Sequence, residues 1–238
     1  METVNNNLYI TFSTKEDGNM SKKYSKDINN TINNKKKFFQ KEKITNSIIL
    51  LTTNKDIIVE IDNNYDLTKD INADAAITKN KTLFLYINFA DCVPLVIYDK
   101  KQNIMAFAHL GWKSTVLDLH KKVINLFLNK YNSNPKDLIA YLGPSIKKET
   151  YIVKSTHQIV SDNLIKDYVK NTKDDLYSID LQGYIIDGIK ELGITEIINS
   201  DIDTGSNENM FSHHRCTKVD SNELEGRFIC GVMMKEDE

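Results

Sequence analysis

One cysteine and one histidine, at the ends of two apolar runs, are the most reactive pair of side chains in this sequence. Cys92 stands directly before residues 93–98, and His109 directly follows residues 104–108. Both runs are about the length of a strand and contain β-branched and aromatic residues, and the polar residues 99–103 between them predict a turn. The segment therefore predicts a β-hairpin. Because the start of one antiparallel strand lies beside the end of the next, we expect the thiol and the imidazole to lie side by side.

A thiol beside an imidazole is compatible with three interpretations. Both groups are preferred ligands of zinc and of some copper sites, and a catalytic zinc usually has three protein ligands and one open position. The same pair could act without a metal, with Cys92 as nucleophile and His109 as base. In the structural interpretation, the cysteine packs as a small apolar side chain and the histidine hydrogen-bonds a loop. The spacing of the two residues does not decide between them.

A second group of reactive side chains is the run Ser-His-His-Arg-Cys at residues 212–216. If this run is a strand, His213 and His214 point to opposite faces, so at most one of them faces a given pocket. Arg215 and, further along, Arg227 could hold an anion with their guanidinium groups. The alternatives are an exposed loop and arginines that pair with surface carboxylates.

The remaining pattern predicts an α/β chain of the α+β type. We expect one layered domain over residues 1–238, with mixed β-sheets flanked by helices. A helix should follow the central hairpin, because apolar residues recur at helical spacing from Val116, with Ser114 as the N-cap. Its first N–H groups could then face an anion at the site. The predicted strands are 8–13, 47–52 and 57–61 (joined by a turn at 53–56), 73–78, 83–88, 138–142, 194–199 and 227–234; the other predicted helices are 27–43, 155–170 and 181–192, and residues 201–225 are predicted to be a loop.

The overall composition narrows the class of protein. The formal net charge is −2, with lysine and aspartate mixed along the chain, which favours neither a nucleic-acid partner nor attraction to a membrane. Three cysteines without close spacing are a poor disulfide framework, and the first residues lack the pattern of a signal peptide. We therefore expect a cytoplasmic protein with reduced thiols. We also expect a monomer.

Several motifs, in the same order along nearly the whole chain, resemble those of the laccase-domain, or polyphenol oxidase, family typified by YfiH. They are Phe12-Ser-Thr-Lys15 with Gly18 and Ser21, Ala73 to Thr78, Ala90-Asp-Cys-Val-Pro94, Ala108-His-Leu-Gly-Trp-Lys113, Gly143-Pro-Ser-Ile146 with Tyr151, and Phe211-Ser-His-His-Arg215 followed by Gly226-Arg227.

The resemblance implies a YfiH-like fold and an enzyme of the purine nucleoside phosphorylase or adenosine deaminase type. Its substrates would be phosphate and a purine nucleoside, namely adenosine, inosine or methylthioadenosine. Two alternatives stay open: a metal-free Cys-His hydrolase, including one that edits peptidoglycan precursors, and a degenerate member that only binds a nucleoside or a protein. Phenol oxidation is disfavoured, because the sequence lacks the many cysteine and histidine ligands of a multicopper centre.

The resemblance also implies a metal site made of His, Cys and His, which would hold zinc or, alternatively, copper. Cys92 matches the cysteine of that set and His109 the second histidine. The position of the first histidine falls on Thr53 or Asn54, and no histidine precedes His109 anywhere in the chain. Because a neutral oxygen is a poor substitute for imidazole, we expect metal binding here to be weak or absent.

The other roles follow from the same resemblance. The catalytic residues would be Cys92, His109, His213 and Arg215. The positive field around phosphate would come from Lys15, Lys113 and Arg227, with the helix start at Ser114. Lys15 and Lys113 stand where the family has arginine, which keeps the charge but loses bidentate recognition of an anion.

Overall fold

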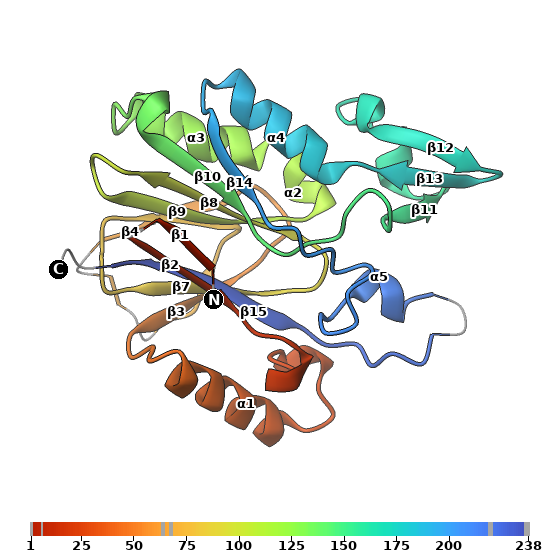
Figure 1. Cartoon of the computed structure of the whole chain (residues 1–238), viewed down its shortest axis with the longest axis horizontal. Coiled ribbons are helices and arrows are strands. Elements are labelled where there is room, and N and C mark those ends of the chain that lie inside the picture. Colours follow the sequence, from red (N-terminus) through yellow and green to blue (C-terminus); the bar gives the residue numbers. More distant parts are fainter. Residues whose placement is uncertain (1, 6, 63–64, 67–68, 219–220, 236–238) are drawn as a thin grey trace.

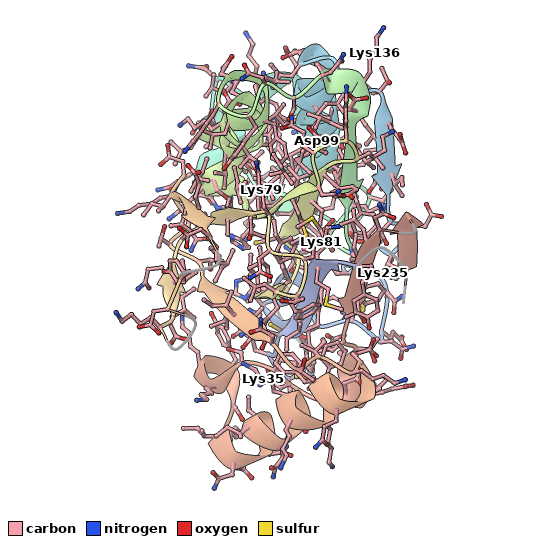
Figure 2. All side chains as sticks on the ribbon, turned by 90° about the vertical axis from the view of Figure 1, so that its left-hand side faces the viewer. Lys35, Lys79, Lys81, Asp99, Lys136 and Lys235 are labelled. Atoms are coloured by element: carbon pink, nitrogen blue, oxygen red, sulfur yellow. The ribbon has the colours of Figure 1, made fainter. Side chains whose placement is uncertain are left out.

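The computed structural model describes residues 2–5, 7–62, 65–66, 69–218 and 221–235. Two six-stranded sheets stack face to face, and helices cover both outer faces of the stack (Figure 1). Helix α1 (Ile28–Lys41) lies under one sheet, while α2 (Trp112–Val116), α3 (Leu119–Asn129) and α4 (Leu181–Glu191) lie over the other. Figure 2 shows the same layers after a quarter turn, with Lys35 at the α1 end and Lys136 at the opposite end. The predicted class, with mixed sheets flanked by helices, is confirmed.

Each large sheet combines parallel and antiparallel neighbours. The first has the order β1-β2-β15-β7-β3-β5, and the second β14-β10-β8-β9-β6-β4. A third sheet, β11-β13-β12, has three strands. The strands are β1 (Glu2–Asn5), β2 (Leu8–Phe12), β3 (Ser47–Leu51), β4 (Ile58–Ile61), β5 (Ile71–Asn72), β6 (Ala75–Thr78), β7 (Phe84–Phe89), β8 (Val93–Asp99), β9 (Ile104–Leu110), β10 (Leu138–Leu142), β11 (Ile152–Lys154), β12 (Val169–Lys173), β13 (Leu176–Ile179), β14 (Glu196–Asn199) and β15 (Phe228–Met234).

The predicted central hairpin is present as β8 and β9, and every residue of both strands is buried. The two strands pair in antiparallel register, with Val93 opposite Leu110 and Asp99 opposite Ile104. At the turn, Oδ1 of Asp99 accepts hydrogen bonds from the backbone N–H groups of Lys101 and Gln102, both at 2.8 Å. This short turn fixes the register, and the register fixes which residues lie together at the far end of the hairpin.

Alternate residues of β8 belong to different hydrophobic layers, which explains why the run is apolar throughout. Leu95 and Ile97 pack towards α3 and α4, whereas Val96 and Tyr98 pack into the layer between the two large sheets. A smaller layer, which includes Phe38, lies between the first sheet and α1. The hairpin is therefore held on both faces, and its site end is anchored by the core of the molecule.

The predicted pairing of residues 47–52 with 57–61 through a turn is wrong. β3 joins the first large sheet, parallel to β7, and β4 joins the second, parallel to β6. The intervening segment crosses between the sheets, and the carboxylate of Asp74 holds it there. That buried carboxylate accepts hydrogen bonds from the backbone N–H groups of Thr53, Asn54 and Lys55.

The helix predicted over residues 155–170 is also absent. The structure has short 3₁₀ turns at Gln158–Ser161 and Lys166–Tyr168, followed by β12. Polar side chains here bond to the nearby backbone: Nδ1 of His157 accepts from the N–H of Ile159 at 3.2 Å, and Oδ1 of Asp162 accepts from the N–H of Leu164 at 2.9 Å. Such local bonds compete with helix formation, which explains why apolar spacing alone misled the prediction.

The helix predicted from Ser114 begins earlier and is interrupted. Its first piece, α2, starts at Trp112 with Gly111 as the N-cap, so Ser114 is not the N-cap. The helix is interrupted at Asp118, which has a φ of 57°, and α3 begins at the next residue. The predicted helices 27–43 and 181–192 correspond to α1 and α4. None of the described helices is both long enough and apolar enough to cross a lipid bilayer.

His120, on α3, is a buried group that should control acid stability. Its ring lies 5.5 Å from the ring of Tyr184 on α4, and a Cβ at Gly188 would come within 2.4 Å of its Nε2. Neither ring nitrogen has a hydrogen-bond partner among the described residues. Burial, only partly offset by Asp118, lowers the pKa of His120 to about 4.

We expect the free energy of unfolding of His120→Leu to decrease less than that of the unmodified protein as the pH falls below 6.5. The unfolded chain binds a proton on this histidine near its ordinary pKa of 6.5, whereas the folded chain does not until about pH 4. The contribution of His120 to the free energy of unfolding is therefore fully present above pH 6.5. It is lost as the pH falls from 6.5 to about 4, by about 3 kcal/mol in total. Urea unfolding of both proteins from pH 7.5 to 4 measures the difference, and a difference that does not change with pH would contradict this role.

Candidate functional site

The end of the central hairpin brings together the predicted cysteine and histidine. Pro94, two residues after Cys92, pairs with His109 across the two strands. A Cβ placed on Gly111 would lie 3.2 Å from the sulfur of Cys92 and 3.5 Å from Cε1 of His109. Thiol and imidazole thus flank the same small space, which exists because residue 111 is a glycine. The expected juxtaposition is confirmed.

Asn54 is the third side chain at this point. Its Oδ1 lies 3.6 Å from the same Cβ position on Gly111. Its backbone has a φ of 56° and donates to Oδ1 of Asp74 at 2.7 Å, which aims the amide at the hairpin end. Thr53, the other candidate for this position, bonds with its hydroxyl to the carboxylate of Asp74 instead. The group formed by Asn54, Cys92 and His109 is called the central triplet below.

Burial keeps the thiol and the imidazole of the central triplet uncharged. Desolvation and the neighbouring Asp91 raise the pKa of the Cys92 thiol to about 12. Desolvation also lowers the pKa of His109 to about 4, although Asp74 opposes that shift. Nδ1 of His109 is buried and has no hydrogen-bond partner in the described part of the chain. A neutral imidazole with a free nitrogen is suited to bind a metal or a polar ligand group.

Two cavities meet at the central triplet. One has a volume of about 310 Å³ and is lined by Ala90, Asp91, Cys92, Gly111, Trp112, Ile146, Tyr151, Val153, His157, Leu181, His213, His214 and Thr217. The other, of about 390 Å³, is lined by Ser21, Lys23, Tyr24, Ile49, Leu50, Leu51, Thr52, Asn54, Ile87, Asn88, Ala90, Cys92, His109, His213 and Arg227. Cys92 and His213 line both. We name the first the aromatic cavity and the second the cationic cavity.

The cationic cavity takes its charge from Arg227 and Lys23. The guanidinium carbon of Arg227 lies 3.8 Å from the centre of the Tyr24 ring, and Lys23 lies 5.2 Å from the same ring centre. Arg227 also donates to the carbonyl oxygen of Gly226 at 2.7 Å and to Glu225 at 3.1 Å. No carboxylate lines this cavity among the residues that the structure describes. The arrangement suits a bound anion.

His213 and His214 both reach the aromatic cavity, because they lie on a helix and not on a strand. The helix is α5 (His213–Cys216). Nδ1 of His213 contacts Oε1 of Glu225 at 2.8 Å. The ring of His214 packs edge-on against Tyr151, 5.8 Å between centres, and its Nε2 has no partner in the described ranges. The expectation that at most one of them faces a pocket is wrong.

Asp91 connects α5 to the central triplet. Its Oδ2 accepts the backbone N–H of His214 at 2.6 Å, and its Oδ1 accepts the hydroxyl of Thr204 at 2.7 Å. Asp91 has a φ of 80°, a left-handed conformation that costs a non-glycine residue energy. Its two acceptor bonds therefore hold the residue before Cys92 in a conformation that it would not adopt alone.

Sequence reasoning missed several residues of the cavities. His157, which was given no role in the site, lies 5.5 Å from Trp112 and lines the aromatic cavity. Tyr151 lies in the same cavity, and burial raises its pKa. Tyr24 and Lys23 lie outside the family-like motifs, and no spacing pattern in the sequence singles them out. The signal for Tyr151 was present, because it belongs to one of the family-like motifs.

Other residues proposed from the sequence lie away from the cavities. The side chains of Lys15, Lys113, Ser114 and Arg215, all in the described part of the chain, line neither one. Lys15 pairs with Glu223 at 3.4 Å. Lys113 is exposed, 5.5 Å from the ring of Trp112. The buried hydroxyl of Ser114 donates within the start of α2, to the carbonyl oxygens of His109 and Gly111, and so braces the site.

The side chain of Arg215 has a structural role, because its nitrogens donate hydrogen bonds within the protein. Its Nη1 donates to the carbonyl oxygens of Thr204 and Asn207 at 2.7 and 2.8 Å, and its Nη2 donates to that of Met210 at 2.7 Å. Its Nε donates to Glu223 at 2.7 Å. A half-buried loop is thereby fastened to α5, which keeps His213 and His214 at the cavity.

We expect Arg215→Lys to destabilise the protein by about 2 kcal/mol or more, because one ammonium group cannot replace these four bonds and charged hydrogen bonds contribute about 1.5–3 kcal/mol each. Urea unfolding measures the change. A role in binding substrate would give the opposite pattern, a raised KM with unchanged stability.

Comparison with known proteins places this geometry in a family. Residues 10–235 match the family model described as multi-copper polyphenol oxidoreductase laccase. A protein of Rickettsia conorii named purine nucleoside phosphorylase is 29% identical over 216 residues, 86% of this chain and 87% of that protein. A second protein named purine nucleoside phosphorylase, from Clostridium acetobutylicum, is 33% identical over 152 residues. The match covers 63% of this chain and 61% of that protein. The purine nucleoside phosphorylase YlmD of Bacillus subtilis is 41% identical over 80 residues, but the match spans only 29% of that protein.

Solved structures agree on the fold. YlmD from Geobacillus stearothermophilus has a TM-score of 0.85 at 19% identity, covering 99% of this chain and 94% of the other. Protein YfiH of Bacillus licheniformis has a TM-score of 0.81 at 23% identity, covering 96% of this chain and 93% of its own. The match of the family model to almost the entire sequence, with the same fold, shows that the chain belongs to the multi-copper polyphenol oxidoreductase laccase family of YfiH- and YlmD-like proteins.

Proposed function

We propose that this chain is a purine nucleoside phosphorylase whose reaction takes place where the aromatic and cationic cavities meet. The observation that carries the proposal is the central triplet, which surrounds one point at the junction of the two cavities. The names of the relatives from Rickettsia and Clostridium support the same reaction.

The two cavities suit the two halves of the reaction. A purine would bind in the aromatic cavity, where Trp112, Tyr151 and His157 offer ring surfaces and Ile146 and Leu181 offer apolar contact. Phosphate would bind in the cationic cavity beside Arg227 and Lys23. The ribose between them would then lie next to Cys92 and His213, which line both.

In this proposal, a phosphate oxygen attacks C1′ of the ribose while the bond from C1′ to the purine nitrogen breaks. The products are ribose 1-phosphate and the free base, and the base takes up one proton as it leaves. In the ion-free protein, the imidazolium form of His213 is placed to supply that proton, because its Nδ1 contacts Glu225 and its Nε2 keeps a proton to transfer to the base. Closure of the site against water by the aromatic side chains would favour phosphate over water as nucleophile.

The central triplet fits a metal ion only in part. Cys92 and His109 offer a sulfur and an imidazole nitrogen, and Nδ1 of His109 lacks another partner within the described ranges. The third donor is the neutral amide oxygen of Asn54, a weaker ligand than the histidine of related sites. These residues would hold zinc or copper, and the thiol would have to lose its proton on binding. Such an ion would supply Lewis acidity next to the reacting sugar or base, which is also the requirement for deamination of adenosine.

The pKa shifts disfavour the metal-free hydrolase. A Cys-His pair works as a nucleophile when the thiol gives its proton to the imidazole. Here burial raises the pKa of Cys92 to about 12 and lowers that of His109 to about 4, so the neutral pair is strongly preferred. The alternative reaction therefore lacks an activated thiolate.

The proposal is tested by incubating the purified full-length protein with adenosine, inosine and methylthioadenosine, with and without phosphate, and separating the products. We expect free base and ribose 1-phosphate, or its methylthio derivative, only when phosphate is present. Inosine formed from adenosine without phosphate would identify the deaminase instead. Release of base that does not depend on phosphate, or no conversion of any nucleoside with or without added zinc, would contradict a phosphorylase.

A further inference from the structure

A second cluster of metal-binding side chains lies on and beside α5, separate from the central triplet. A ring nitrogen of His213, the sulfur of Cys216 and a carboxylate oxygen of Glu225 all lie within 4.8 Å of one another. His213 and Cys216 are three residues apart on α5, a spacing that puts both on one face of the helix. Glu225 comes from the segment before β15. The cluster therefore joins two parts of the chain.

Surrounding contacts hold these side chains in position. Oγ of Ser212 accepts the backbone N–H of Arg215 at 3.1 Å and so caps α5. Nη2 of Arg227 donates to Oε1 of Glu225 at 3.1 Å, and the same oxygen contacts Nδ1 of His213 at 2.8 Å. Contacts of this kind orient metal ligands and improve their affinity.

We propose that His213, Cys216 and Glu225 bind one zinc ion. Nitrogen, sulfur and carboxylate oxygen are the donors that zinc prefers in proteins. Zinc bonds of about 2.0–2.3 Å place neighbouring ligand atoms roughly 3.3–3.8 Å apart. The 2.8 Å contact between His213 and Glu225 would therefore have to open, and any separation close to the 4.8 Å limit would have to shorten by about 1 Å. Three protein ligands leave one position of a tetrahedral zinc open. His213 lines both cavities, so the cluster lies at the rim of their junction.

The competing arrangement is an ion-free one, in which His213 and Glu225 remain a hydrogen-bonded pair and the Cys216 thiol stays half-exposed. The positive charge of Arg227 beside Glu225 favours that arrangement. Three donor atoms that converge, two of them on one helix face, favour the ion. The two arrangements differ in a property that can be measured without any activity assay.

The test uses full-length Cys92→Ser protein, in which the central triplet has lost its strongest donor. Equilibrium dialysis against zinc should show one bound ion per chain. Adding Cys216→Ser should weaken that binding by about 100-fold or more, since loss of an outer partner alone costs about 10- to 100-fold. With cobalt in place of zinc, the thiolate-to-cobalt absorption band should disappear on the same change.

Two variants with equal loss of charge provide the control. Glu225→Gln should weaken zinc binding, whereas Glu208→Gln, on an exposed position of the preceding loop, should not. Circular dichroism confirms that each variant is folded. The proposal is overturned if the Cys92→Ser protein binds no zinc, or if it binds zinc equally well after Cys216→Ser or Glu225→Gln. Neither result depends on whether the protein is a phosphorylase.

Discussion

Cys92→Ala should reduce kcat/KM for phosphorolysis by about 10²- to 10³-fold, the scale of losing one preorganised group beside the reacting atoms. The sulfur lines both cavities and is the strongest donor of the central triplet. Alanine leaves the other cavity walls in place but removes the thiol, which together with His213 lines both halves of the proposed site. The measurement is the steady-state rate of base release at saturating phosphate.

The matched control is Cys230→Ala. Cys230 is likewise not part of a disulfide, but it is fully buried on β15 in the layer between the two large sheets. Its loss should lower stability modestly, as removal of buried atoms does, and leave kcat/KM close to that of the unmodified protein. Equal loss of activity in both variants, or a folded Cys92→Ala protein with normal turnover, would remove Cys92 from the mechanism.

Asn54→His should strengthen zinc binding at the central triplet by about 100-fold or more. A residue that only hydrogen-bonds a metal ligand contributes about 10- to 100-fold, and a direct ligand should contribute more. The substitution replaces a neutral amide oxygen with an imidazole at a position already aimed at Cys92 and His109. The φ of 56° at residue 54 is tolerated, since histidine is among the residues enriched in the left-handed region. Zinc affinity measured in Cys216→Ser protein isolates this site from the cluster at α5.

Thr53→His is the control for that substitution. The side chain of Thr53 hydrogen-bonds to Asp74 and not to the triplet. A histidine at residue 53 should therefore not increase the affinity for zinc. If Thr53→His raised the affinity and Asn54→His did not, the assignment of Asn54 to the third position would be wrong.

The pair of Cys92 and His109 could be predicted from the sequence because their proximity depends on local features. Five polar residues between two apolar runs define the turn, and the turn defines the register of β8 and β9. Helix α4 was predictable for the same reason, since its apolar spacing agrees with its packing against α3. Where residues close in sequence determine an element, the sequence pattern was sufficient to predict it.

The rest of the site depends on contacts between residues far apart in sequence. Asn54 reaches the triplet because Asp74, twenty residues later, holds the crossing segment between the sheets. Arg215 is occupied by backbone carbonyl oxygens, which no sequence pattern reveals. The two adjacent histidines fall in a segment predicted to be a loop, but the hydroxyl of Ser212 caps a short helix there, and both histidines line the aromatic cavity.

The most direct test of the central claim is a crystal structure of the protein with a purine nucleoside, or with the product base and ribose 1-phosphate. We predict the purine ring among Trp112, Tyr151 and His157, the phosphate beside Arg227, and the sugar next to Cys92. Density for the ligand at another surface, with the junction of the two cavities filled only by water at saturating ligand, would contradict the proposed site.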